Sequence, residues 1–311
     1  MKKRIFIITF FAFVKVSAFF AAAGSSSGLT LIQPVCARAA SMGDAFTAVA
    51  DDINAVYYNP AGLIRYDRRE FSTTYIKGVL DFSYYSAGFH ASYKNKYAFA
   101  GNFTAFSAGE AEIYNIDGSI NNVKALEDSV YTAALAKNLG GGFSAGINIK
   151  YLSSVIAEEF KNEACPFDAG ILYRKNTPGK RISFGLCLQN MGANLKSPLA
   201  GDEGEKLPQI NRAGVSYTSK KYGKNVTVSA DALQFSEDPA FKMHFGVEYA
   251  FAGKFSLRAG YKTGYDLSSM SAGFGIYTND ILIDFGTSMM GVLGYTYNVS
   301  LSFKLKPAIN R

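Results

Sequence analysis

The chain has 311 residues, with 30 Gly, 25 Phe, 20 Tyr, no Trp and a formal net charge of +7. Four positive charges, Lys2, Lys3, Arg4 and Lys15, fall within the first 23 residues, which hold no acid, so the rest of the chain has a formal charge of only +3. A nucleic-acid-binding function is therefore not expected.

Residues 1–23 have the features of a secretory signal peptide. A basic start precedes the apolar run from Ile5 to Val14, and small residues around Ala23 suit cleavage there. This run is too short to span a membrane, and no later window of about 18 consecutive apolar residues exists. We therefore expect an exported protein without a spanning helix.

Residues 24–69 are rich in Ala and turn formers and precede the first strand, which predicts a compact hatch inside a barrel lumen. Asn59 is biased toward an extended conformation by Pro60, and Gly62 gives the chain freedom after the turn. We expect Asp51 and Asp52 to pair with lumen cations such as Arg212 or Arg258. The alternative is that these residues merely end a short helix over 45–50.

Fourteen strand-like segments with alternating apolar and polar residues follow the hatch. They begin near Phe71, Phe82, Lys96, Ser129, Gly142, Ala164, Arg181, Gln209, Asn225, Phe241, Phe255, Ser269, Ile281 and Tyr295. Three long connections, about 107–128, 153–163 and 192–208, alternate with short turns. This pattern predicts an all-β, transmembrane antiparallel β-barrel of about fourteen strands over residues 70–305, in the cell outer membrane, with a tail at 306–311.

The polar faces of these strands hold ionisable side chains. A charge that faces lipid at the membrane midplane costs about 2–4 kcal/mol, so these side chains should face the lumen. The expected lumen charge network consists of His90, Lys150, Asp168, Arg212, Asp231, Lys242, His244, Glu248, Arg258 and Asp284.

The sequence does not favour an enzyme or a metalloprotein. Its only histidines, His90 and His244, both fall on inward faces, and no nucleophile motif accompanies them. The cysteines Cys36, Cys165 and Cys187 show no metal-ligand spacing, and alternation puts Cys165 and Cys187 on opposite faces, which excludes a bridge between them. We expect no catalytic residues, no metal and no cofactor.

Five stretches of the chain, from the hatch to the last strand, resemble one known family. They are Arg38–Asp52, Tyr58–Leu63, Leu188–Gly192, Leu207–Tyr217 and Gly294–Phe303. The sequence is similar to the PorV/PorQ family, within the FadL-type group of outer-membrane proteins. The resemblance implies a fourteen-stranded barrel with an N-terminal hatch.

The resemblance also implies roles for particular residues. Asn59, Pro60 and Ala61 match the hatch motif that lies in the diffusion path of FadL-type proteins. With Arg38, Gly43, Asp51, Asp52 and Gly62 they are the expected gating residues. The last strand, with Tyr295, Tyr297, Val299, Leu301 and Phe303 on one face, is the expected signal for the barrel assembly machinery, although no terminal aromatic follows it.

Three functions remain open at this point. The first is passive transport of a hydrophobic or amphipathic solute, gated by the hatch. The second is a type IX secretion-associated barrel that holds exported protein cargo at the cell surface, with Ile113, Tyr114 and Ile116 as exposed apolar residues on an outer loop. The third is a sealed structural protein, which requires the lumen charges to pair completely. The expected partners are outer-membrane lipid, the assembly machinery, and a small hydrophobic molecule or an exported protein, but no nucleic acid.

Overall fold

The structure, a computed structural model, describes residues 28–65, 69–79, 82–114, 119–197, 203–238, 240–265, 269–278 and 280–305. The expected signal peptide and the expected tail at 306–311 lie outside the described residues. The expected hatch is described from residue 28 to residue 65.

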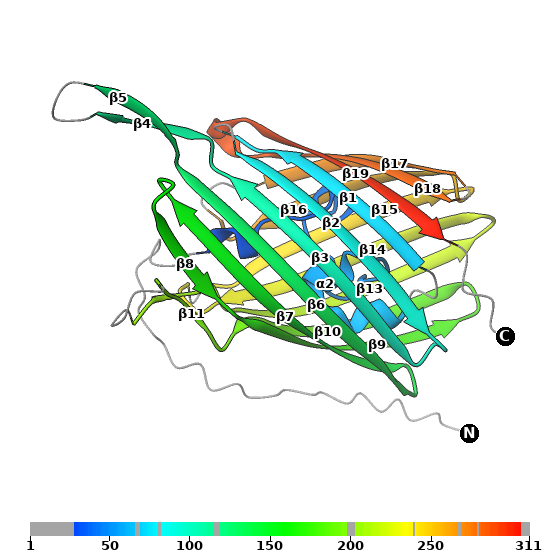
Figure 1. The fold of residues 1–311 in the computed structure, drawn as a ribbon. Coiled ribbons are helices and arrows are strands. Elements are labelled where there is room, and N and C mark those ends of the chain that lie inside the picture. The colour runs from blue at the N-terminus through cyan, green and yellow to red at the C-terminus, as the bar shows by residue number, and fades with distance from the viewer. Residues whose placement is uncertain are drawn as a thin grey trace.

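Fourteen antiparallel strands form a closed barrel, as Figure 1 shows. They are β1 (Arg69–Lys77), β2 (Ser83–Tyr93), β3 (Tyr97–Ser107), β6 (Leu126–Gly140), β7 (Phe143–Ile156), β9 (Phe167–Thr177), β10 (Lys180–Met191), β13 (Ile210–Lys221), β14 (Lys224–Phe235), β15 (Lys242–Phe251), β16 (Phe255–Thr263), β17 (Ser269–Tyr277), β18 (Ile281–Met289) and β19 (Tyr295–Leu305). β1 pairs with β19 along nine residues and closes the wall. The predicted fold class and strand number are confirmed, because every predicted strand start lies within three residues of the observed one.

The alternation of the strands sorts side chains between two environments. On β15, Phe245 and Val247 are exposed on the outside, while His244 and Glu248 are buried inside. Aromatic pairs cross neighbouring strands on the outer surface, such as Tyr75 with Tyr85, whose ring centroids are 4.9 Å apart. A closed barrel with an apolar outside and a polar inside belongs in an outer membrane, because lipid cannot hydrogen-bond open strand edges.

Long connections extend from one end of the barrel, which we call the outer end (Figure 1). They contain the projecting hairpin β4 (Glu110–Tyr114) and β5 (Ile120–Lys124), strand β8 (Phe160–Ala164) beside β7, the short pair β11 (Asn194–Leu195) and β12 (Glu205–Lys206), and η3 (Gly291–Leu293). The connections at the opposite, inner end are short. Cys165 is exposed, Cys187 is buried and all three cysteines are free, in agreement with the predicted faces.

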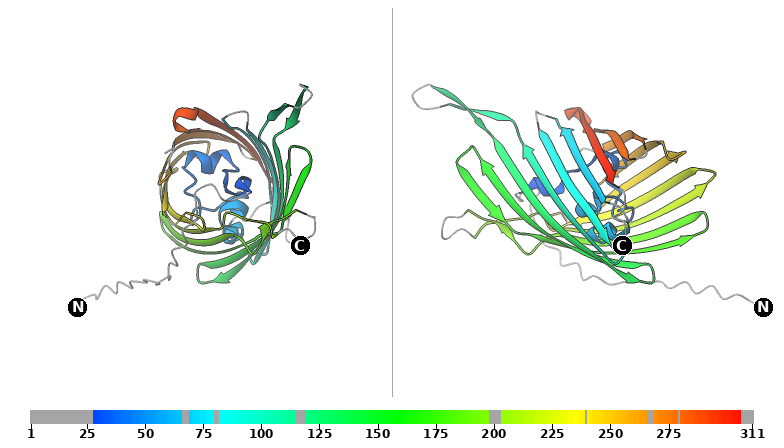
Figure 2. Two further views of the ribbon diagram at one scale, coloured as in Figure 1. Left: turned by 90° about the vertical axis from the view of Figure 1, so that its left-hand side faces the viewer. Right: turned by 45° about the vertical axis from the view of Figure 1, so that its right-hand side comes forward.

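The N-terminal segment lies inside the barrel, as Figure 2 shows in the view along the lumen. It contains η1 (Leu29–Ile32), α1 (Ala37–Ser41), α2 (Ala55–Tyr58) and η2 (Pro60–Arg65). Among the described residues no helix is long and apolar enough to cross a membrane.

The alternative that placed a helix over residues 45–50 is wrong. Left-handed backbone at Gly43, Asp44 and Ala50 interrupts the segment at both ends. In addition, the N–H groups of Phe46 and Thr47 donate to the Asp231 carboxylate of the wall, at 2.9 and 2.8 Å. The wall therefore supplies the hydrogen-bond acceptor at the start of this segment, which forms a turn and not a helix.

Inward-facing glycines let the hatch backbone touch the wall. A Cβ atom at Gly146 would lie 2.4 Å from the carbonyl carbon of Pro60, and a Cβ at Gly185 would lie 2.4 Å from the Thr47 carbonyl oxygen. Glycines face each other across neighbouring strands in four pairs, Gly146–Gly170, Gly185–Gly214, Gly246–Gly260 and Gly273–Gly286. We call these eight residues the glycine girdle; they encircle much of the hatch.

Candidate functional site

A cavity of about 350 Å³ lies between the hatch and the outer end of the barrel. Its apolar side consists of residues from β1, β2 and β3 and their connections, with Ile76, Tyr84 and Phe106 buried together. The ring of Phe106 lies 4.6 Å from that of Tyr84 and 5.6 Å from that of Phe82, measured between centroids. These side chains form an aromatic wall that suits an apolar ligand.

The floor and the opposite side of the cavity come from other parts of the chain. Thr30, Gln33 and Pro34 form the side of the cavity that belongs to the hatch. Met290 and Leu293 extend the apolar lining beside η3, whereas Asn298 and Lys262 add polar groups at one edge. The cavity is therefore largely apolar with a small polar edge.

Lys262 at the polar edge forms an ion pair with Asp44 of the hatch. Asp44 also accepts a hydrogen bond of 2.6 Å from the Tyr58 hydroxyl. Burial by itself raises the pKa of the Asp44 carboxyl, but the Lys262 ammonium, His244 and the hydrogen bond from Tyr58 together outweigh burial and hold the pKa below its usual range. The ion pair between Lys262 and Asp44 thus links the polar edge of the cavity directly to the hatch.

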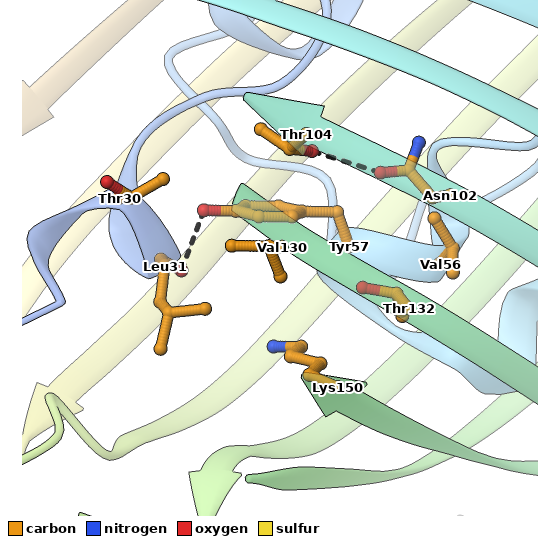
Figure 3. A pocket seen from close by; sticks show the side chains of 9 residues that line it. All are labelled: Thr30, Leu31, Val56, Tyr57, Asn102, Thr104, Val130, Thr132 and Lys150. Atoms are coloured by element: carbon orange, nitrogen blue, oxygen red, sulfur yellow. Dashed lines mark hydrogen bonds between the residues drawn. The ribbon is translucent and has the colours of Figure 1, made fainter. Parts of the chain in front are cut away.

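A separate gap of about 10 Å³, no larger than one water molecule, shares Thr30 with this cavity (Figure 3). Tyr57 of the hatch lines this gap, and its hydroxyl donates to the carbonyl of Leu31 at 2.7 Å. Thr104 and Asn102 of β3, hydrogen-bonded at 3.0 Å, lie on the wall side. Nothing in the sequence pattern indicated that Tyr57 occupies this position.

An ion-pair cluster around Arg38 holds the hatch to the wall. Arg38 contacts Asp51 and Asp52 at 2.8 Å and Glu248 at 2.9 Å. Glu248 in turn contacts Arg258 at 2.7 Å, and Arg258 contacts Asp284 at 2.6 Å. The structure thus brings together three expected hatch residues and three expected lumen residues.

The expected pairing of Asp51 and Asp52 with Arg212 or Arg258 is corrected by this arrangement. Arg258 is connected to the two aspartates only through Glu248 and Arg38. Arg212 lies over the Tyr58 ring, 5.3 Å from its centroid, and two of its buried nitrogens have no hydrogen-bond partner. The second cation on Asp51 is Arg181, at 3.0 Å, which the sequence reasoning missed.

Asp51 is ionised in this cluster. Burial by itself raises the pKa of its carboxyl, but the guanidinium groups of Arg38, Arg181 and Arg174 together outweigh burial and hold the pKa well below its usual range. The cluster is therefore an ionic bond between hatch and wall that persists at neutral pH.

The expected hatch motif is held by hydrogen bonds to the wall. The Asn59 side chain donates to the carbonyls of Thr47 at 3.1 Å and Ile171 at 3.2 Å, and its oxygen accepts from the Ala61 N–H. Ser144 donates to the Ala61 carbonyl at 2.8 Å. Gly62 leaves room for the Ala50 carbonyl, which a Cβ would meet at 2.3 Å.

The remaining expected lumen residues lie in separate contacts. Lys150 pairs with Asp168 at 2.8 Å, Lys242 pairs with Asp238 at 2.6 Å, and His90 contacts the Leu63 carbonyl at 3.0 Å. His244 contacts the Tyr265 hydroxyl at 2.8 Å. In the described part of the chain, no three His, Cys, Asp or Glu side chains are grouped as metal ligands.

The last strand forms one face of outward residues. Tyr295, Tyr297 and Val299 are exposed, and Leu301 and Phe303 are half-buried between the neighbouring strands. β19 pairs with β18 on one side and with β1 on the other.

Comparisons with solved structures agree with this architecture. The Ralstonia pickettii toluene transporter TbuX has 14% sequence identity and a TM-score of 0.56, with 88% of this chain and 98% of that chain covered. The CymD monoaromatic hydrocarbon channel and the Pseudomonas putida toluene transporter TodX each have 12% identity and a TM-score of 0.57, with 88% of this chain and 98% and 97% of theirs covered. No protein-family model and no curated protein matches the sequence. The chain therefore has the FadL-type fold, a fourteen-stranded outer-membrane barrel.

Proposed function

We propose that this protein is an outer-membrane channel for a small hydrophobic or amphipathic solute, gated by its hatch. The observation on which the proposal rests is the largely apolar cavity of about 350 Å³ on the outer side of the hatch. A cavity of about 150 Å³ lined by Leu, Ile and Phe is enough to bind benzene. This one is large enough for a single aromatic ring with substituents.

The polar edge of the cavity favours a solute with one hydrogen-bonding group. Asn298 is 1% exposed, and neither its amide nitrogen nor its amide oxygen has a hydrogen-bond partner in the described structure. A buried amide without a partner costs roughly 1–3 kcal/mol, so a polar group of the solute that reached it would be bound favourably. The similar structures include a toluene transporter and a monoaromatic hydrocarbon channel, which supports the aromatic part of the proposed solute.

A solute that moves inward from the cavity must pass the hatch. The strands beside the cavity pair without interruption, β2 with β3 over eleven residues and β18 with β19 over nine, so this part of the wall has no opening. The small gap lined by Tyr57 lies along the hatch and shares Thr30 with the cavity. We infer that a movement of the hatch, including Tyr57, opens the path, and that the Arg38 cluster limits this movement.

The resemblance to the PorV/PorQ family supports a second candidate, a barrel that holds exported protein at the cell surface. The β4–β5 hairpin projects from the outer end (Figure 1), and its residues Ile113, Tyr114 and Ile120 are exposed. Ile116, the third residue expected there, lies outside the described residues. The sealed structural role is less favoured, because Arg212 is left with unpartnered buried nitrogens. Under either candidate, the outward residues of β19 remain the proposed assembly signal.

The transport proposal is tested by filling the cavity. Ala108→Trp adds a large side chain to the cavity lining just after β3, whereas Ala105→Trp adds the same side chain to the outward face of β3. In cells with an intact lipopolysaccharide layer, uptake of a labelled monoaromatic compound should fall severalfold with Ala108→Trp and stay unchanged with Ala105→Trp. Equal uptake by both variants at equal surface amounts would contradict the proposal.

A further inference from the structure

The inner end of the barrel contains a second cavity, of about 380 Å³, on the opposite side of the hatch from the apolar one. Five cationic side chains line it: Arg65, Arg174, Lys180, Arg181 and Lys220. No acidic residue is among the described residues that line it. The charge at this mouth is therefore strongly positive.

The cations come from elements that are far apart in the sequence. Arg65 ends η2 of the hatch, Arg174, Lys180 and Arg181 flank the turn between β9 and β10, and Lys220 is near the end of β13. Of these five cations, only Arg181 has a carboxylate partner in the described part of the chain. This partner is Asp51, which also pairs with Arg38. The other four have no ion pair there, so most of the positive charge is not neutralised.

Arg174 gives the clearest sign that the site is built for a ligand. It is 6% exposed, and its hydrogen bonds go to the Ser183 hydroxyl at 3.2 Å and the Val49 carbonyl at 2.5 Å, both neutral acceptors. Arg174 has no ion pair of its own, and the carboxylate that acts on it, Asp51, already pairs with Arg38 and Arg181. A buried cation short of counter-charge is costly, and proteins compensate for it with an anion. Nearby, Nε of Arg65 and Nε of Arg181 are buried without a hydrogen-bond partner.

The neutral residues of the lining fit the same ligand chemistry. Asn138 near the end of β6 and Asn176 near the end of β9 add amide donors, and Thr177 adds a hydroxyl. Arginine forks with lysines and amide donors are a typical set of partners for phosphate oxygens. A single carboxylate would leave more of the charge uncompensated than a phosphate dianion.

We propose that the inner mouth of the barrel is a binding site for a small oxyanion of the phosphate class, either inorganic phosphate or a phosphomonoester. The bound group contacts Arg65 of the hatch and the wall cations together, so it fastens the inner end of the hatch to β9 and β10. The site does not depend on the proposed transport function, because it lies on the other side of the hatch.

The test uses inorganic phosphate and the full-length mature protein in detergent micelles at low ionic strength, with isothermal titration calorimetry. The double variant Lys180→Gln/Lys220→Gln removes two exposed lysines of the site. The matched control, Lys175→Gln/Lys221→Gln, removes two exposed lysines beside the same strand ends that do not line the cavity. Both variants change the net charge equally, and neither removes a buried residue.

The proposal predicts saturable phosphate binding by the wild-type protein. We expect the dissociation constant to rise at least about tenfold in the site variant and to change by less than about twofold in the control, since charged contacts to phosphate depend on distance and geometry. Acetate at the same concentration should not displace the phosphate, and glycerol phosphate in place of inorganic phosphate distinguishes a phosphomonoester ligand by tighter binding.

Three results would overturn the proposal: no saturable binding in the millimolar range, equal weakening in both double variants, or displacement by acetate at equal concentration. Uptake of the aromatic solute by Lys180→Gln/Lys220→Gln is measured in parallel. Loss of phosphate binding with retained uptake would show that the two proposals can be tested independently of each other.

Discussion

Arg38→Gln is the substitution that should loosen the hatch most directly. In the folded protein Arg38 forms ion pairs with Asp51, Asp52 and Glu248, and its side chain is 13% exposed. Removing one partner of a buried ion pair costs about 3–5 kcal/mol, because the other partner stays buried with its charge. Asp51 retains Arg181 and Glu248 retains Arg258, so we expect the lower end of this range.

A cost of about 3 kcal/mol raises the population of hatch-open molecules roughly a hundredfold. The thiol of Cys36 reports this population, because Cys36 is fully buried and lies two residues before Arg38. In a Cys165→Ser/Cys187→Ser background, the rate of maleimide labelling of Cys36 should increase by up to this factor in Arg38→Gln. The circular dichroism of the barrel strands should stay unchanged.

Lys124→Gln is the control for this experiment. It breaks an ion pair with Glu127 whose side chains are 52% and 43% exposed, and exposed pairs contribute at most about 1 kcal/mol. Its labelling rate should equal that of the background. An Arg38→Gln rate equal to that of Lys124→Gln would refute the role of the Arg38 cluster in holding the hatch.

Two further predictions concern the contacts of the hatch. The pKa values of Asp51 and Asp44 are lowered in the folded protein relative to about 3.9 in an unfolded chain, so their stabilisation is complete above about pH 4 and is lost as the pH falls further. The temperature at which the folded band disappears on gels should therefore be constant near neutral pH and should decrease at pH values below about 4. The decrease should be smaller in Asp51→Asn. An equal decrease in this variant would contradict the assignment. Gly146→Val should push Pro60 away and speed the labelling of Cys36, whereas Gly101→Val, at a site with no atom within 4 Å of the added Cβ, should have no effect.

The strands were predictable because each one carries its own signal. Alternation within a single segment, such as Tyr295 to Leu305, is enough to assign a strand and its lipid face, and the short turns at the inner end fix the pairing. The position of the hatch followed from its place before the first strand and from the family resemblance. The alternation within each strand and the short inner turns therefore predict most of the barrel.

The contacts of the hatch were not predictable in the same way. Arg181 rather than Arg212 meets Asp51 because left-handed backbone at Asp44 and Ala50 turns the hatch chain, and no strand pattern reports this turn. The outer cavity unites residues near 76–126 with residues near 288–298, which meet only when the barrel closes. One signal was overlooked: the glycine girdle falls on the polar, inward faces of the strands, where small residues indicate close contact with another segment.

Native mass spectrometry of the protein, extracted gently from its own outer membrane, tests the central claim most directly. The account predicts one small hydrophobic or amphipathic molecule retained at one-to-one stoichiometry, with reduced retention in Ala108→Trp and normal retention in Ala105→Trp. An exported protein that copurifies in the absence of any small molecule would contradict the solute channel and support the secretion-associated barrel.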